Sequence, residues 1–294
     1  MKIATSAYPL DFHRNWADYA AKIETWVADA AGQGAELLLF PEYGAMELAT
    51  LAGAETAADH EGCMVAVSER MEDANSLHSE LAAKYKVHIV GASAPVYDPD
   101  FGPRPVNRAY VFTPTGATAH QDKQLMTRYE REAMDVIGGG PLHLFDTALG
   151  KIGILICYDS EFPLLGRALH DADLILVPSC TEAQAGYSRV RIGAMARALE
   201  TQCVSAMASL VGKAEWCEHV DTNAGMGGVF GPPDTGFPPT GILAEGTMYT
   251  PGWTYAEVDP AAIARVRADG NVLGRTHWAE QDGRDTYVTA ERLR

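Results

Sequence analysis

Short apolar runs alternate with amphipathic segments over most of the chain. The runs have the length and the β-branched content that are typical of strands. The segments between them repeat apolar residues at helical spacing, most clearly over 15–33, where Trp16, Tyr19, Ile23 and Val27 fall on one side. Strands are predicted at 2–8, 37–40, 87–94, 108–113, 118–123, 142–146, 151–158, 173–178, 203–210, 227–231 and 254–258, and helices at 15–33, 65–85, 162–170 and 189–201. This alternation predicts an α/β protein.

Turn signals refine this pattern. Pro114-Thr115-Gly116 lies between two predicted strands and is typical of a β-hairpin, so a mixed sheet is expected. Residues 223–241 are rich in Gly and Pro and predict a loop without the GxGxxG fingerprint of a dinucleotide site. No repeat, linker or charge block divides the chain, and residues 1–294 are therefore expected to form a single domain.

Composition narrows the classes of partner. The chain has 294 residues, 47% of them hydrophobic, and a formal net charge of −16, which argues against nucleic acid or an anionic membrane as a partner and favours a small molecule. Five cysteines, at 63, 157, 180, 203 and 217, are odd in number and dispersed, unlike a disulfide framework or a metal site. No signal peptide and no membrane-spanning run is evident, so a soluble, cytoplasmic protein is expected.

Polar residues follow three of the predicted strands. Glu42 comes after the apolar run 37–40, Lys123 ends the strand 118–123, and Cys157 lies near the end of the strand 151–158. Strand ends of α/β proteins face the crevice in which ligands bind. A charge at the end of an apolar strand is costly to desolvate, so Glu42 and Lys123 are expected to pair, with Cys157 close to both.

A carboxylate, an ammonium and a thiol together make a nucleophilic site. The carboxylate can take the proton of the thiol and later return it to a leaving amine. The ammonium favours the thiolate and stabilises a developing oxyanion. The backbone N–H of Tyr158, directly after the cysteine, is a candidate for a second donor to that oxyanion.

Three segments carry a resemblance to a known family. Phe40-Pro41-Glu42, Lys123-Gln124-Leu125 and residues 153–163 resemble, in order and spacing, the three signatures of the nitrilase superfamily of carbon–nitrogen hydrolases. Residues 172–178 and 197–202 resemble the strand and helix that come next in that family. The resemblance covers about residues 1–260 and implies a four-layer αββα sandwich of two mixed sheets, assembled into homodimers or larger homo-oligomers. Residues after about 260 are expected to form a C-terminal tail that packs on a neighbouring subunit.

The resemblance also implies roles for single residues. Glu42 would be the general base and acid, Lys123 the cation that stabilises the oxyanion, and Cys157 the nucleophile. A second glutamate usually follows the lysine, and Glu130 fits that role best, with Glu132 as the alternative. The chain departs from the family at Leu164, where a glutamate is common, and it lacks the usual proline between the lysine and the second glutamate.

The remaining polar candidates receive lesser roles. Cys180 also follows a predicted buried strand but lacks the Tyr-Asp turn that follows Cys157, and it is assigned to the pocket wall together with Tyr43 and Thr181. Arg191 and Arg197 are expected to form salt bridges at a sheet edge or subunit contact. The histidines are scattered, and none is assigned to catalysis.

The expected reaction is hydrolysis of a non-peptide C–N bond through a cysteine thioester. No metal and no organic cofactor is expected, because side chains supply both the nucleophile and the charge stabilisation. Nitrilases tend to carry Trp-Glu after the cysteine, whereas Tyr158-Asp159 is more similar to the amidase and carbamoylase branches. A small amide is therefore the expected substrate, with an N-carbamoyl compound or a nitrile as alternatives. A non-catalytic binding or assembly protein of the same fold is a further alternative, against which the intact triad argues.

Overall fold

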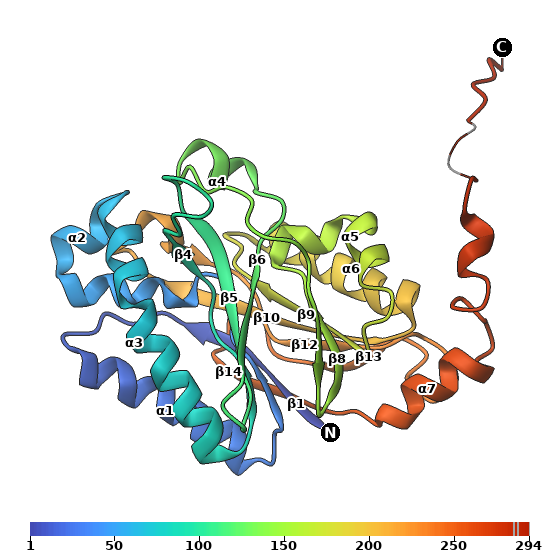
Figure 1. Ribbon diagram of the computed structural model, residues 1–294, viewed down its shortest axis with the longest axis horizontal. Helices are drawn as coiled ribbons and strands as arrows, with labels where there is room; N and C mark the ends of the chain where they lie inside the picture. Colours follow the sequence, from blue (N-terminus) through green and yellow to red (C-terminus); the bar gives the residue numbers. More distant parts are fainter. Residues whose placement is uncertain (285, 287, 294) are drawn as a thin grey trace.

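The computed structural model contains a curled, mixed sheet with helices on both sides (Figure 1). It describes residues 1–284, 286 and 288–293. The strands are β1 (Lys2–Pro9), β2 (Leu37–Leu39), β3 (His88–Val90), β4 (Ala94–Val96), β5 (Val106–Phe112), β6 (Thr118–Asp122), β7 (Leu144–Thr147), β8 (Gly150–Ile154), β9 (Leu174–Ser179), β10 (Val204–Lys213), β11 (Thr222–Asn223), β12 (Gly228–Phe230), β13 (Ile242–Glu245) and β14 (Gly252–Glu257). The α-helices are α1 (Trp16–Gly32), α2 (Ala54–Ala58), α3 (Gly62–Tyr85), α4 (Arg128–Glu132), α5 (Pro163–Ala168), α6 (Gln184–Thr201) and α7 (Pro260–Asp269), and the 3₁₀ helices are η1 (Gly44–Ala52), η2 (Cys157–Glu161), η3 (Glu218–Val220) and η4 (Trp278–Gln281).

β1 joins the two halves of the sheet. The main strand order is β4-β5-β3-β2-β1-β10-β9-β8-β7. β1 pairs in parallel with β2 through Ile3–Thr5, but it meets β10 through Ala7, Tyr8 and Pro9 at its other end. The antiparallel strand β14 runs beside Lys2–Ala7. The ends of β2, β6 and β8 come together, since Glu42 after β2 contacts Lys123 after β6, and Asp159 after β8 contacts Leu125 after β6.

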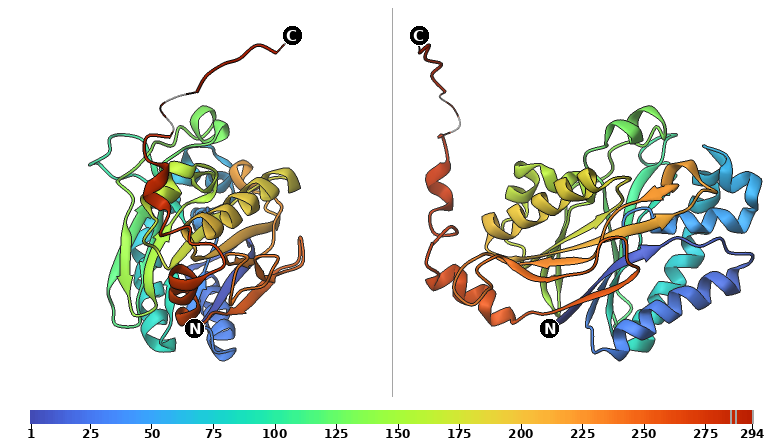
Figure 2. Two further views of the ribbon diagram at one scale, coloured as in Figure 1. Left: turned by 90° about the vertical axis from the view of Figure 1, so that its right-hand side faces the viewer. Right: turned by 180° about the vertical axis from the view of Figure 1, so that it is seen from behind.

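The helices cover the sheet because each presents one apolar side. Asn15 caps α1 by accepting the backbone N–H of Asp18, and Tyr19, Ile23 and Val27 of this helix are buried, as their spacing predicts. Ala4 and Tyr8 of β1 belong to the same buried cluster as the apolar side of α1 and α3, whereas Ile3 belongs to the cluster that includes α6. Figure 2 shows α1 and α3 on one side of the sheet and α5 and α6 on the other. The mixed α/β class is therefore confirmed.

The structure corrects two predicted strands. The strand expected over 151–158 ends at Ile154, and Cys157 instead begins the 3₁₀ helix η2 with a φ of 50°, which cannot continue a strand. The strand expected over 87–94 is two strands, since β3 runs parallel to β2 whereas β4 pairs antiparallel with β5. The hairpin is confirmed: β5 and β6 are antiparallel, and Gly116 has a φ of 86° in the turn between them.

Several short elements were not predicted, among them α2, α4 and α7. α7 buries Ala262, Ile263 and Val266 against the rest of the molecule, so the chain just after 260 is packed on its own body. Beyond α7 the chain still contacts the body through η4 and the residues just before it, where Arg275 pairs with Asp171 and Trp278 stacks on His170, and its described end, residues 288–293, lies away from the body (Figure 1). None of the helices in the described residues is long and apolar enough to cross a membrane.

Candidate active site

Glu42 lies just past the end of β2, where the chain enters the body of the protein. Its side chain is buried, and Tyr43 after it adopts a left-handed conformation with a φ of 55°. Glu42 Oε1 accepts hydrogen bonds from Lys123 Nζ at 2.7 Å and from Asn107 Nδ2 at 2.9 Å. Its Oε2 accepts the backbone N–H of Cys180 at 2.9 Å. Both carboxylate oxygens are therefore held in fixed positions.

Lys123 follows β6 and is fully buried. Besides Glu42, its ammonium donates to Glu130 Oε1 at 2.8 Å and to Oε2 at 2.6 Å. The backbone N–H of Lys123 donates to Asn107 O at 2.8 Å, which continues the pairing of β6 with β5 up to the lysine. The pairing that the sequence predicts between Glu42 and Lys123 is thus present, and the lysine has a second carboxylate partner.

That second carboxylate comes from the short helix α4. Thr127 caps α4 in a capping box, in which Glu130 Oε2 accepts the backbone N–H of Thr127 at 2.8 Å. Tyr43 OH donates to Glu130 Oε1 at 2.8 Å. Glu132, the alternative for this position, is exposed and pairs with Arg128 at 2.8 Å. Glu130, rather than Glu132, is therefore the second glutamate that contacts Lys123.

Cys157 is the first residue of η2 and is 4% exposed. Its positive φ turns the chain sharply at the cysteine, a backbone strain that is common where side chains react. The thiol donates to Cys180 O at 3.6 Å, and Cys157 O accepts the hydroxyl of Ser160 at 2.7 Å. Tyr158 is the second residue of η2, and the first N–H groups of a helical turn have no acceptor within it.

Asp159 fixes the turn that carries Cys157 relative to the lysine loop, the segment of Lys123, Gln124 and Leu125. Its buried carboxylate accepts the backbone N–H groups of Leu125 at 2.8 Å, Gln124 at 3.1 Å and Ile156 at 3.3 Å. Behind the turn, α6 approaches closely at Gly193, where a Cβ atom would lie 2.7 Å from Ser160 O. The turn that carries Cys157 is therefore held from two sides.

Burial and charge set the protonation of the cluster. Burial lowers the affinity of Lys123 for its proton, but the neighbouring carboxylates outweigh this and hold its pKa well above the usual range. Burial likewise opposes ionisation of Glu130, yet the Lys123 ammonium and the bonds from Thr127 lower its pKa. The pKa of Glu42 is raised, chiefly by burial. The lysine is thus a permanent cation beside one ionised glutamate and one that takes up a proton more readily.

The pKa of the Cys157 thiol departs from the expectation drawn from the sequence. The sequence suggests that the ammonium favours the thiolate, but burial and the negative charge of Glu42 raise the pKa of Cys157 well above its ordinary value, and Lys123 only partly opposes them. The Cys157 thiol is therefore neutral at rest, and Glu42 is the carboxylate beside it.

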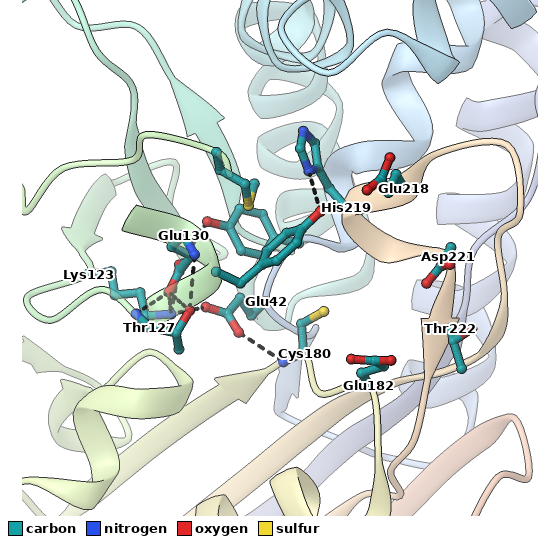
Figure 3. A pocket seen from close by; sticks show the side chains of 13 residues that line it. Glu42, Lys123, Thr127, Glu130, Cys180, Glu182, Glu218, His219, Asp221 and Thr222 are labelled. Carbon is teal, nitrogen blue, oxygen red and sulfur yellow. Dashed lines mark hydrogen bonds and ion pairs between the residues drawn. The ribbon is translucent and has the colours of Figure 1, made fainter. Parts of the chain in front are cut away.

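A cavity of about 340 Å³ opens beside this cluster (Figure 3). Its wall includes Glu42, Lys123, Glu130, Tyr43 and Cys180. Cys157 is not among the described residues that line this cavity, but it interacts with Glu42 and Cys180, which both do. The cavity volume suits a small molecule.

The other candidates lie as follows. Thr181 is outside the described lining and donates its hydroxyl to Ala224 O at 2.8 Å, and Tyr158, also outside it, packs edge-on against Phe162. Arg197 is buried and donates to Ser160 O at 3.0 Å and to Glu200 at 2.8 Å, so it supports the cysteine turn.

Sequence reasoning missed two buried side chains of the cluster. Asn107 contacts Glu42 and, at 3.4 Å, Glu130, and Asp159 joins the lysine and cysteine loops. An asparagine within an apolar strand is a signal that could have pointed to Asn107. Cys63 and Cys217, which had no assigned role, are both buried and interact with each other.

Comparison with known proteins places this chain in a family. The family model of the carbon-nitrogen hydrolases matches residues 3–268. The chain belongs to the carbon–nitrogen hydrolase family. This confirms the resemblance that the three motifs carry.

Two relatives of this chain have curated descriptions. It is 31% identical over 274 residues to the probable hydrolase YhcX of Bacillus subtilis (strain 168), a match that covers 92% of this chain and 52% of that protein. The chain thus spans about half the length of that relative. It is 28% identical over 205 residues to the omega-amidase NIT2 of Danio rerio, covering 66% of this chain and 69% of that protein.

A solved structure shows the same fold. Saccharomyces cerevisiae Nit3, a member of branch 10 of the nitrilase superfamily, superposes with a TM-score of 0.70 at 22% identity. The match covers 91% of this chain and 93% of Nit3. The curled mixed sheet with its covering helices is therefore the nitrilase-superfamily fold.

Proposed function

We propose that this carbon–nitrogen hydrolase cleaves the C–N bond of a small amide through a thioester on Cys157, releasing ammonia and a carboxylic acid. One observation carries the proposal: the buried Lys123 ammonium lies 2.7 Å from Glu42 and 2.6 Å from Glu130, beside the Cys157 turn. A buried carboxylate, ammonium and thiol in contact suit acyl transfer.

In the first stage Glu42 takes the proton from the Cys157 thiol as the sulfur attacks the amide carbon. The carbonyl π electrons move to oxygen, and the Lys123 ammonium and the Tyr158 N–H stabilise the oxyanion. When the tetrahedral intermediate collapses, the C–N bond breaks and Glu42 gives its proton to the leaving nitrogen. Ammonia departs, and the acyl group remains on sulfur.

In the second stage Glu42 takes a proton from water, and the hydroxide attacks the thioester carbon. Collapse of the second intermediate breaks the C–S bond, and the sulfur recovers its proton from Glu42. The acid leaves, and the enzyme returns to its starting state. The raised pKa of Glu42 supports this sequence, because it makes the carboxylate a better proton acceptor, and the raised pKa of the thiol means that Cys157 needs that base.

An amide suits the site better than the alternatives. Tyr158-Asp159 follows the cysteine, and the Danio rerio relative is named an omega-amidase. N-carbamoyl compounds and nitriles would use the same groups, and ammonia release from a panel of all three classes separates them.

The test is ammonia release from small primary amides by the purified protein. Activity is expected to fall at least about a thousandfold in Cys157→Ala, because no nucleophile remains. Cys180→Ala is the matched control, since it removes a second thiol from the cavity wall but keeps the backbone groups that contact Glu42 and Cys157. Full activity in Cys157→Ala would overturn the proposal.

A mass measurement separates catalysis from simple binding. Acrylamide, an amide with an electrophilic double bond, is expected to add to Cys157, because Glu42 beside it can take the proton of the thiol. Cys63, Cys203 and Cys217 do not share that base and are expected to stay unmodified in the folded protein. The same measurement on Cys180→Ala shows whether the adduct is on Cys180, which lines the cavity. An unmodified Cys157 in a protein that binds amides without releasing ammonia would favour the non-catalytic alternative.

We also propose a larger architecture. The two halves of the curled sheet would be the two facing sheets of an αββα sandwich, and a second copy of the chain would cover the exposed apolar residues Leu164, Ile192 and Leu199 on α5 and α6. The described residues beyond η4 would pack on that neighbour, since Arg275 and Trp278 contact their own body. Five free cysteines support a reducing, cytoplasmic compartment.

A further inference from the structure

The cavity beside Lys123 carries an excess of negative charge. Five carboxylates line it, those of Glu42, Glu130, Glu182, Glu218 and Asp221. Among the described residues of this lining, Lys123 is the one permanent cation, and Glu42 and Glu130 already hold it. His219 adds no charge near pH 7, because burial lowers its pKa.

Three of these carboxylates lie away from the reacting groups. Figure 3 shows Glu182, Glu218 and Asp221 on the side of the cavity away from Lys123 and Glu130. Glu218 pairs with His60 at 2.6 Å. Within the described part of the chain, Glu182 and Asp221 have no ammonium or guanidinium within 4.0 Å; the nearby Lys213 instead pairs with Glu215 at 3.0 Å.

An aromatic ring accompanies these carboxylates. Tyr129 lines the cavity and is 42% exposed, and its hydroxyl meets His219 Nδ1 at 3.1 Å, which fixes the ring. Tyrosine faces and carboxylates together are the groups that bind organic cations, the ring through its quadrupole and the carboxylates through charge. The acidic groups therefore line a cavity that already contains a reactive centre and an aromatic wall.

We propose that Glu182, Asp221 and Tyr129 select substrates whose end distant from the amide carries an ammonium group. The substrate class is a short ω-amino amide: its carboxamide reaches Cys157 and Lys123, and its ammonium faces the carboxylates on the other side. This inference rests on the proposed amidase function, since it names the substrates of the same cavity. Glu182 and Asp221 would also repel an amide whose distant end carries a carboxylate, so such amides are expected to be poor substrates.

A matched series tests the selection. 4-Aminobutanamide, pentanamide and glutaramate share the H₂N–CO–(CH₂)₃ unit and end in ammonium, methyl and carboxylate. At pH 7.5 and low ionic strength, kcat/KM is expected to be at least about tenfold higher for 4-aminobutanamide than for pentanamide, and lowest for glutaramate. The advantage of the cation should shrink as salt screens the partly exposed carboxylates.

Substitutions locate the effect. In the double variant Glu182→Gln/Asp221→Asn the ratio of kcat/KM values for 4-aminobutanamide and pentanamide is expected to fall by about tenfold, chiefly through KM. Both residues are exposed, so the variant is expected to fold. Glu69→Gln is the control: it removes a similarly exposed carboxylate on α3, outside the described lining, and should keep the parent ratio.

The outcomes separate this inference from the proposed function. The inference is overturned if pentanamide and 4-aminobutanamide are hydrolysed with equal kcat/KM. It is also overturned if the double variant leaves the ratio of the two kcat/KM values unchanged. In both cases the proposed amidase function stands. If no amide is hydrolysed, calorimetric binding to the Cys157→Ala protein decides. Tighter binding of 4-aminobutanamide than of pentanamide supports the inference, whereas equal affinities or absent binding of 4-aminobutanamide overturn it.

Discussion

The Asp159 carboxylate accepts the backbone N–H of Leu125 at 2.8 Å, although the two residues are 34 positions apart. Leu125 follows the loop of Lys123, and Asp159 belongs to the turn of Cys157. One buried side chain therefore sets the position of the Lys123 loop relative to the turn of Cys157. Because Asp159 touches backbone groups rather than the reacting atoms, it is a positioning residue.

Asp159 is expected to make stability depend on pH. Burial raises its pKa to about 7, above the value of an unfolded aspartate. Its contribution is therefore fully present below the unfolded pKa of about 4 and is lost as pH rises through about 7, because the folded state then gives up a proton that it holds more tightly than the unfolded chain does.

Asp159→Asn tests this relationship. Urea titrations between pH 4 and 8 give the unfolding free energy of the parent and of the variant. The parent's value relative to the variant's should fall as pH rises from about 4 to about 7 and level off by pH 8. Asp146→Asn, at an exposed site, should follow the parent at every pH. A constant difference between parent and Asp159→Asn would contradict the assignment. At pH 8 the variant should also lose kcat by about tenfold or more, since the two loops are less well held.

Removal of the buried cation should be severe for the fold as well as for the reaction. Lys123→Met leaves Glu42 and Glu130 buried without a counter-charge, which is expected to cost about 3–5 kcal/mol of unfolding free energy at pH 7. The double variant Lys123→Met/Glu130→Gln should recover part of that loss, because one of the two buried charges is gone. Equal stability of the single and double variants in urea titrations would contradict this account.

Glu130 and Glu132 provide a matched pair on one helix. Glu130→Gln removes a charge that holds Lys123 at 2.6 Å, and we expect a loss of about 2 kcal/mol in stability and at least about tenfold in kcat. Glu132→Gln should change stability by no more than about 0.5 kcal/mol, because its partner Arg128 is exposed. Urea titration and ammonia release measure both, and similar losses in the two variants would remove the distinction.

Gly193 is expected to control how closely α6 approaches the cysteine turn. A Cβ atom there would lie 2.7 Å from the backbone oxygen of Ser160, so Gly193→Ala must displace the helix or the turn. We expect a loss of about 1–3 kcal/mol in stability together with a lower kcat. Gly32→Ala, at a helical site with nothing within 4 Å of the added atom, is the control and should be neutral or stabilising. Unchanged activity in Gly193→Ala would show that the turn tolerates the shift.

Much of the site followed from the sequence because its evidence is local. The apolar run before Glu42 is strand β2 in the structure, and the second strand of the predicted hairpin, which ends before Lys123, is β6. Opposite charges that must be desolvated predict each other as partners, and these two residues lie 2.7 Å apart. The hairpin and the long helix α1 were equally readable, the first from its Pro-Thr-Gly turn and the second from its apolar stripe.

Other features arise where distant segments meet, and no local pattern encodes them. Asn107 and Asp159 enter the cluster through bonds to residues 65 and 35 positions away. Cys157 lies in a 3₁₀ turn rather than a strand because contacts with α6 and the lysine loop hold its backbone at a positive φ, which the apolar run before it does not reveal.

The sequence alone therefore determined most of the long helices and strands and the family motifs, and it named the candidate reactive groups, since these depend on spacing and residue type. The tertiary structure decided which glutamate meets the lysine, how the thiol is protonated and which charges line the cavity. The physical reason is that burial, pKa and cavity shape depend on side chains brought together by the curled sheet from remote parts of the chain.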